Sequence, residues 1–141
     1  MKRVVATGTF DILHPGHIYY LEESRKLGDE LHVIVARDAN VRHKPKPVIR
    51  EAQRLRVIQA LRVVDFARLG DATDMFRPIE EIDPAVITLG FNQHFSEEQL
   101  REALKERGIG AEVVRIGEYS GDPYTSTRRI IDRIIETRGK P

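Results

Sequence analysis

The stretch GTFDILHPGH at residues 8–17 decides the fold of this chain, because it reads as a strand end, a tight loop and a helix start. A short apolar run at residues 3–7 precedes it, and Gly8 allows the backbone to turn sharply. The proline and second glycine of the stretch make another turn before the helical pattern begins. His14 therefore lies in the loop, and His17 lies in the first helical turn, where free backbone N–H groups favour an anion.

Two histidines at this spacing also permit other interpretations. They can bind a transition metal, or they can cap and pack the start of the helix. The chain contains no cysteine and no obvious third ligand nearby, so we predict no metal-binding residues. Packing accounts for either histidine alone, but it does not explain why Gly8, Thr9, His14, Gly16 and His17 occur together. We therefore interpret the stretch as a phosphate-binding loop.

Length and composition limit the remaining classes. The chain has 141 residues, of which 40% are hydrophobic, so we predict one domain over residues 1–141. Lys and Arg number 23 against 22 Asp and Glu, and a net charge of +1 disfavours a general nucleic-acid partner. No apolar run approaches a membrane span or a signal peptide, so we expect a cytoplasmic protein without a membrane partner. The absence of cysteine excludes disulfides and thiolate catalysis.

Short Val- and Ile-rich runs alternate with longer amphipathic stretches, which is typical of βα units and a parallel sheet. Strands are predicted at residues 3–7, 31–36, 66–69, 85–89 and 112–116. Helices are predicted at residues 17–27, 50–61, 74–82 and 97–107, with a last one beginning near residue 126. The predicted fold class is α/β, a Rossmann-like domain with a five-stranded parallel sheet and helices on both faces.

The last predicted helix carries four isoleucines on one stripe. They are Ile130, Ile131, Ile134 and Ile135, which recur at helical spacing. Such a stripe is typical of contact with a hydrophobic core. We therefore expect this helix to pack on the sheet.

Ligands of such a sheet bind beyond the carboxyl ends of its strands, so the loops there are candidate sites. The loop after the second strand contains Lys44 and Lys46, whose ammonium groups could reach the β- and γ-phosphates of a nucleotide. The loop after the fourth strand offers the amides of Asn92 and Gln93 to a base or an acceptor group. An exposed loop and a surface turn are the alternative interpretations.

The start of the last helix is a further candidate. Three consecutive hydroxyl residues at 125–127 are followed by Arg128 and Arg129. Capping the helix needs only one hydroxyl, whereas three together with two arginines suit a phosphate clamp. An arginine pair on a helix is otherwise often a solvated face, so we favour the hydroxyls of Ser126 and Thr127.

The stretch at residues 8–17 resembles the HxGH motif of the cytidylyltransferase-like nucleotidyltransferases, in which catalysis comes from stabilising charge on the phosphates of a nucleotide. Over nearly the full length, the chain is most similar to archaeal-type FAD synthases, single-domain enzymes that transfer AMP from ATP to FMN. The similarity rests on ATGTFDILHPGH at 6–17, VIVARD at 33–38, EAQR at 51–54 with ALRVVD at 60–65, the segment 69–82 and ITLGFNQ at 87–93.

The resemblance implies roles for particular residues. Expected to be catalytic are His14, His17, Lys44, Lys46 and Arg54. Expected to bind the nucleotide, besides the two histidines, are Thr9, Phe10, Asn92, Gln93, Tyr119, Ser126 and Thr127. Expected to bind the acceptor are Asp11 and Asp38. Mg²⁺, held mainly by phosphate oxygens and water, would accompany ATP, and the superfamily's frequent dimers suggest a homodimer.

Two other functions stay open at this stage. A glycerol-3-phosphate cytidylyltransferase would use the same phosphate-binding residues with CTP, although its connection before the Ser-Thr segment is shorter than residues 115–124 here. A non-catalytic nucleotide-binding module would bind ATP without turning it over. It would not require phosphate-binding residues at both ends of the chain.

Overall fold

Five strands and five helices alternate along the chain. The computed structural model describes residues 1–42, 45–93 and 95–139. The strands are β1 (Arg3–Gly8), β2 (Glu30–Val35), β3 (Phe66–Leu69), β4 (Val86–Leu89) and β5 (Glu112–Arg115). The helices are α1 (Pro15–Arg25), α2 (Glu51–Gln59), α3 (Arg77–Ile82), α4 (Glu97–Glu106) and α5 (Thr127–Arg138), with a 3-10 turn η1 (Asp38–Asn40). The predicted order of elements is confirmed.

All strand pairs are parallel, and the strand order is β3-β2-β1-β4-β5. The order reverses between β1 and β4, since the chain moves outward from β1 to β2 and β3 and then returns to β4 on its other side. A crevice forms beyond the carboxyl ends of the strands at such a reversal. The stretch at residues 8–17 follows β1 directly and therefore enters this crevice.

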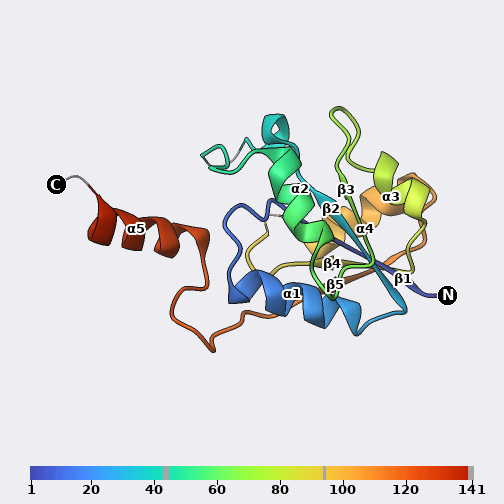
Figure 1. Cartoon of the computed structure of the whole chain (residues 1–141). Helices are drawn as coiled ribbons and strands as arrows, with labels where there is room; N and C mark the ends of the chain where they lie inside the picture. Colours follow the sequence, from blue (N-terminus) through green and yellow to red (C-terminus); the bar gives the residue numbers. More distant parts are fainter. Residues whose placement is uncertain (43–44, 94, 140–141) are drawn as a thin grey trace.

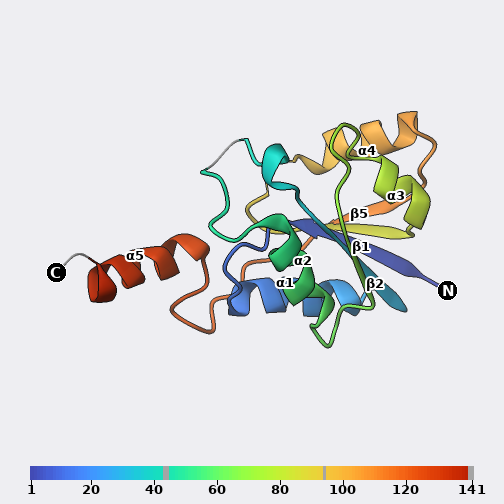
Figure 2. The ribbon, with the colours of Figure 1, turned by 45° about the horizontal axis from the view of Figure 1, so that its top comes forward.

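The alternation of side chains along β1 divides the core into two layers. Val4 and Ala6 pack with residues of α1 and α2, whereas Val5 packs with residues of α3 and α4. Figures 1 and 2 show these two pairs of helices on opposite faces of the sheet. The predicted α/β architecture with helices on both faces is thus confirmed.

The contact of α1 with the sheet is fixed by a buried polar cluster. The Tyr20 hydroxyl donates to the Thr88 carbonyl at 2.9 Å and accepts from the Thr7 N–H at 3.2 Å. Ser24 Oγ lies 2.7 Å from Thr88 Oγ1. Burial raises the pKa of Tyr20 to about 12, so the hydroxyl keeps its proton. These bonds set where the N-terminal end of α1, and hence both histidines, meet the crevice.

The expectation for the last helix is wrong. No residue of α5 is buried, and Ile134 and Ile135 are 50% and 62% exposed. Figures 1 and 2 show the helix extending away from the sheet after the connection that follows β5. The isoleucine stripe identifies an apolar helix face, but it carries no information about whether that face meets the core of its own chain.

Candidate active site

Gly8 and Phe10 shape the start of the loop after β1. Phe10 is buried and adopts a left-handed backbone conformation with φ 54°. A Cβ added at Gly8 would lie 2.8 Å from the Phe10 ring, so glycine is needed for the ring to fold back there. The ring meets the edge of His17 at 5.5 Å between centroids and lies 6.4 Å from Tyr20. Phe10 therefore packs against the His17 ring and helps to hold it in place.

His14 and His17 stack on one another with ring centroids 3.8 Å apart. His14 is the N-cap of α1, and its Nδ1 accepts a 3.1 Å hydrogen bond from the Gly16 N–H. An accepting Nδ1 carries no proton, so the neutral ring keeps its proton on Nε2. Burial lowers the pKa of His14, which favours this neutral form. The loop thus presents an imidazole N–H donor beside the positive end of a helix.

The pKa of His14 predicts a pH dependence of stability. The folded chain binds fewer protons at this ring than the unfolded chain, whose histidine pKa is about 6.5. The free energy of unfolding therefore decreases as the pH falls below about 6.5. His14→Asn keeps a capping acceptor but has no titrating ring, so its free energy of unfolding should fall less between about pH 7.5 and about pH 5.5. Urea unfolding at both pH values measures this, and equal decreases in both proteins would contradict it.

The stretch at residues 8–17, with His14 and His17, is called the histidine loop below. The start of α5 lies against the histidine loop, although the two segments are far apart in the sequence. Thr127 Oγ1 donates to the Ile12 carbonyl at 3.4 Å, and a Cβ on Gly16 would lie 3.1 Å from the Thr125 carbonyl oxygen. Ser126 caps α5 by accepting from the Arg129 N–H at 3.1 Å. The structure therefore brings the start of α5, with its hydroxyl residues, to the loop that carries the two histidines.

Arg54 lies inside the protein. It is 1% exposed, and its guanidinium donates to the Thr9 carbonyl at 2.6 Å, the Ile49 carbonyl at 2.8 Å and Asp38 Oδ1 at 2.5 Å. The hydrogen bond from Arg54 lowers the pKa of Asp38, so this carboxylate is charged. Arg54 was expected to be catalytic; in the structure its guanidinium is buried and ties the histidine loop to the segment after β2.

The acidic residues expected at the acceptor also hold loops together. Asp11 accepts from the Val48 and Ile49 N–H groups, both at 2.8 Å. Asp38 accepts from Arg54 and from the Glu51 N–H. Each carboxylate thus joins the segment before α2 to the histidine loop or to α2 itself.

Lys46 is exposed and donates to the Asp38 carbonyl at 2.9 Å. This bond keeps the ammonium group at the carboxyl end of β2, one strand away from the histidine loop. Lys44, the second cation expected here, lies outside the described residues.

The loop after β4 uses one of its two predicted amides internally. Gln93 Nε2 donates to the Thr7 carbonyl and to Thr7 Oγ1, while Gln93 Oε1 accepts from the Gly90 N–H. Arg115 holds the same loop by donating to the carbonyls of Gly90 and Gln93. Gln93 therefore joins the ends of β1 and β4, whereas Asn92 is exposed.

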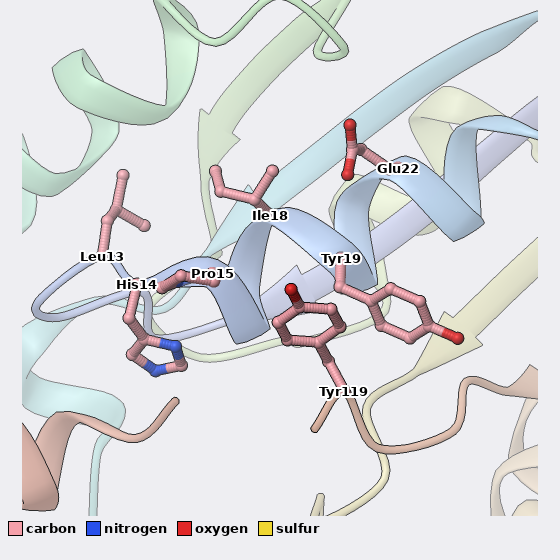
Figure 3. Close-up of a pocket in the computed structure, with 7 residues that line it drawn as sticks. All are labelled: Leu13, His14, Pro15, Ile18, Tyr19, Glu22 and Tyr119. Atoms are coloured by element: carbon pink, nitrogen blue, oxygen red, sulfur yellow. The ribbon is translucent and has the colours of Figure 1, made fainter. Parts of the chain in front are cut away.

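A pocket of about 480 Å³ adjoins His14 (Figure 3). Tyr119 stacks on Tyr19 with ring centroids 5.2 Å apart, and its hydroxyl donates to Asp122 at 2.9 Å. That hydrogen bond raises the pKa of Tyr119. The pocket is lined by Leu13, His14, Pro15, Ile18, Tyr19, Glu22 and Tyr119. Of these, the sequence prediction included only His14 and Tyr119.

The contribution of α1 to this pocket went unnoticed. Ile18, Tyr19 and Glu22 share one side of the helix, because residues three and four apart lie next to one another. An apolar residue and an aromatic residue on that side, just after the histidine loop, were the available signal. The sequence alone does not show their partner, because Tyr119 comes about 100 residues later in the chain.

Among residues 1–42, 45–93 and 95–139, no group of three or more His, Asp or Glu side chains is arranged to hold a metal ion. Within the same part of the chain, no helix combines the length and apolar character of a membrane span.

Comparison with known proteins places this geometry in a family. A family model described as Cytidylyltransferase-like matches residues 5–133. A FAD synthase of Methanolacinia petrolearia is 69% identical over 140 residues, covering 99% of this chain and 95% of that protein. A FAD synthase of Methanocorpusculum labreanum is 67% identical, covering 99% of this chain and 100% of that protein.

A solved structure agrees with the sequence comparisons. The lipopolysaccharide core biosynthesis protein of Thermoplasma volcanium shares 50% identity and a TM-score of 0.82, over 85% of this chain and 99% of that chain. The family match includes both the histidine loop and the start of α5, the two segments that meet at the crevice. This chain therefore belongs to the cytidylyltransferase-like family.

Proposed function

We propose that this chain transfers the AMP moiety of ATP to FMN, forming FAD and pyrophosphate. The observation that carries the proposal is the contact between the histidine loop and the start of α5, because one triphosphate can then reach both. Similarity to FAD synthases, at 69% and 67% identity over 99% of the chain, supports ATP and FMN as the substrates.

The reaction is an in-line displacement at the α-phosphorus of ATP. A phosphate oxygen of FMN forms a new P–O bond while the bond to pyrophosphate breaks, and no proton has to leave the attacking dianion. Catalysis then consists mainly of positioning the two substrates and stabilising the charge that develops on the phosphates. His14 donates through its Nε2–H, and His17 acts beside it on the α- and β-phosphates.

The β- and γ-phosphates lie at the start of α5 in this proposal. Ser126 and Thr127 offer hydroxyls and free N–H groups at the positive end of that helix. Lys46 and Lys44, which follow β2 in the sequence, supply two cations. Arg54 contributes as a positioning residue, because it holds the Thr9 carbonyl and the Asp38 side chain at fixed distances.

Mg²⁺ enters this account as part of the ATP substrate complex. No group of three metal ligands occurs among the described residues, so these residues do not fit a metal ion held by the protein alone. We therefore assign no catalytic step to a protein-bound metal. Phosphate oxygens and water satisfy the usual coordination of this ion.

The pocket beside His14 and Tyr119 suits the base of the nucleotide. It adjoins His14 and offers the stacked rings of Tyr19 and Tyr119 as an aromatic surface. Thr9, Phe10, Asn92 and Gln93 contribute to nucleotide binding in this proposal, Phe10 and Gln93 through the contacts that hold the loops in place. Asp11 and Asp38 act on the acceptor through the loops that they fix.

Three properties of the whole protein complete the proposal. It acts in the cytoplasm, it requires no nucleic acid, as its net charge of +1 suggests, and it forms a homodimer, as many members of its superfamily do. Sedimentation of the purified protein measures the last property directly.

Incubation with ATP, FMN and Mg²⁺, followed by chromatography, tests the proposed reaction. We expect FAD and pyrophosphate in equal amounts. A parallel incubation with CTP and glycerol 3-phosphate should release much less pyrophosphate. Turnover of CTP with glycerol 3-phosphate but not of ATP with FMN would assign the chain to a cytidylyltransferase, and binding of ATP without turnover would make it a nucleotide-binding module.

A further inference from the structure

A second cavity lies at the carboxyl ends of β2 and β3. It has a volume of about 300 Å³ and is polar, and its lining comprises Arg37, Arg68, Leu69, Gly70, Asp71, Arg77, Pro78 and Glu81. Figures 1 and 2 show the β3–α3 connection and η1 at the same end of the sheet, which is the end that bears the histidine loop. None of these residues belongs to the site described above.

The cavity is joined to the histidine loop by a short series of contacts. Arg54 donates to the Thr9 carbonyl in that loop and to Asp38. Arg37, which directly precedes Asp38, donates through Nε to the Gly70 carbonyl at 2.6 Å. A substrate whose phosphate lies at His14 can therefore extend along this edge of the sheet and place its far end in the cavity.

Hydrogen-bond donors exceed acceptors in the cavity. Arg37 is engaged by Gly70 and Glu51, and Arg68 uses one nitrogen on Glu81 at 2.6 Å. Arg77 is exposed, and within the described part of the chain no hydrogen bond or ion pair engages its guanidinium. A guanidinium carries five N–H donors, so the cavity can donate several hydrogen bonds to a ligand.

Two carboxylate oxygens complement these donors. Asp71 takes its hydrogen bonds from the Thr73 N–H, the Thr73 hydroxyl and the Asp74 N–H on Oδ2, which leaves Oδ1 for a ligand. Glu81 uses Oε1 on Arg68, which leaves Oε2. The cavity can therefore accept at least one hydrogen bond as well as donate several.

The charges of the lining distinguish between kinds of ligand. Arg37, Arg68 and Arg77 are opposed by Asp71 and Glu81, and Glu51 pairs with Arg37 from outside the lining at 3.3 Å. These opposing charges nearly cancel, which weakens the attraction for a phosphate dianion. A neutral group with carbonyl acceptors on either side of an N–H donor fits the arrangement better.

From this pattern we infer that the cavity binds the pyrimidine edge of the flavin ring, with Arg77 donating to a ring carbonyl and Asp71 or Glu81 accepting from the ring N–H. The inference rests on the proposed function, since it places FMN between His14 and the cavity. It also provides a recognition role that Asp11 and Asp38 do not supply, because their carboxylates are engaged by backbone N–H groups and Arg54.

Arg77→Ala tests the inference, with Arg62→Ala as its matched control. Both arginines are exposed. Arg62 lies between α2 and β3, shortly before Asp65, whose N–H donates to the Leu31 carbonyl near the start of β2. Arg62 is therefore at the end of the sheet opposite the cavity. Riboflavin binding, followed by flavin fluorescence, probes the ring without its phosphate. We expect Arg77→Ala to weaken riboflavin binding about tenfold and to raise the KM for FMN similarly, with the KM for ATP unchanged. Arg62→Ala should alter none of these.

Other results would overturn the assignment of the cavity. Equal riboflavin binding by the wild type and Arg77→Ala would remove the ring from this cavity, even if the wild type makes FAD. If Arg77→Ala weakened the binding of ATP or pyrophosphate but not that of riboflavin, the cavity would be an anion site instead. A wild type that makes no FAD but binds riboflavin through Arg77 would refute the proposed reaction and retain the cavity. A wild type that neither makes FAD nor binds riboflavin would refute both.

Discussion

Replacing His17 with alanine is expected to lower kcat for FAD formation on the order of 100-fold, while the Kd for ATP changes by less than about threefold. The ring stacks on His14 with centroids 3.8 Å apart, in the first turn of α1. A donor in this position acts on charge that develops only as the α-phosphoryl group is transferred. Its loss therefore costs more in the transition state than in the bound ground state.

Steady-state rates and ATP titrations separate the two effects. Glu102→Ala is the control, because Glu102 is exposed on α4, on the face of the sheet opposite α1. Circular dichroism establishes that His17→Ala is folded. If the two variants lost activity equally, or if His17→Ala lost ATP affinity in proportion to kcat, the assignment of His17 to the transition state would be wrong.

Arg54→Met is expected to lower the free energy of unfolding by about 3 kcal/mol. Methionine retains much of the buried apolar stem, but it removes the donors that serve the Thr9 carbonyl, the Ile49 carbonyl and Asp38. Buried acceptors without partners cost more than the hydrogen bonds themselves contribute. Asp38 is partly exposed, so water offsets part of the loss at that carboxylate.

Urea unfolding without nucleotide measures this loss. Arg56→Ala, an exposed arginine two residues further along α2, should change the free energy of unfolding by less than about 0.5 kcal/mol. An Arg54 that served only to bind phosphate would behave like Arg56 in this experiment. Equal stability of the two variants would therefore contradict the structural role that we assign to Arg54.

The central strands of the sheet could be predicted from the sequence because they are buried on both faces. The VITL run of β4, at Val86–Leu89, is buried throughout, and such continuous β-branched runs are distinctive. The boundaries of helices were less accurate, since Pro15 already belongs to α1 and α3 begins at Arg77 rather than at residue 74. Proline in the first helical turn accounts for the early start of α1.

The direction in which a side chain points was harder to predict. Arg54 was expected to be catalytic, but that expectation did not include a buried guanidinium that donates to backbone carbonyls. The stripe on α5 predicted core contact, yet Ile134 and Ile135 are exposed. Both outcomes depend on segments that are distant in the sequence, which helical spacing cannot reveal. The cluster of hydroxyls at residues 125–127 was informative because capping alone did not explain it.

A crystal structure of this chain with Mg²⁺ and a non-hydrolysable ATP analogue tests the central claim most directly. The account predicts one triphosphate within hydrogen-bond distance of the His14 ring and of the N–H or hydroxyl groups of Ser126 and Thr127. A triphosphate that contacted only one of these two segments, or that bound away from both, would contradict the account.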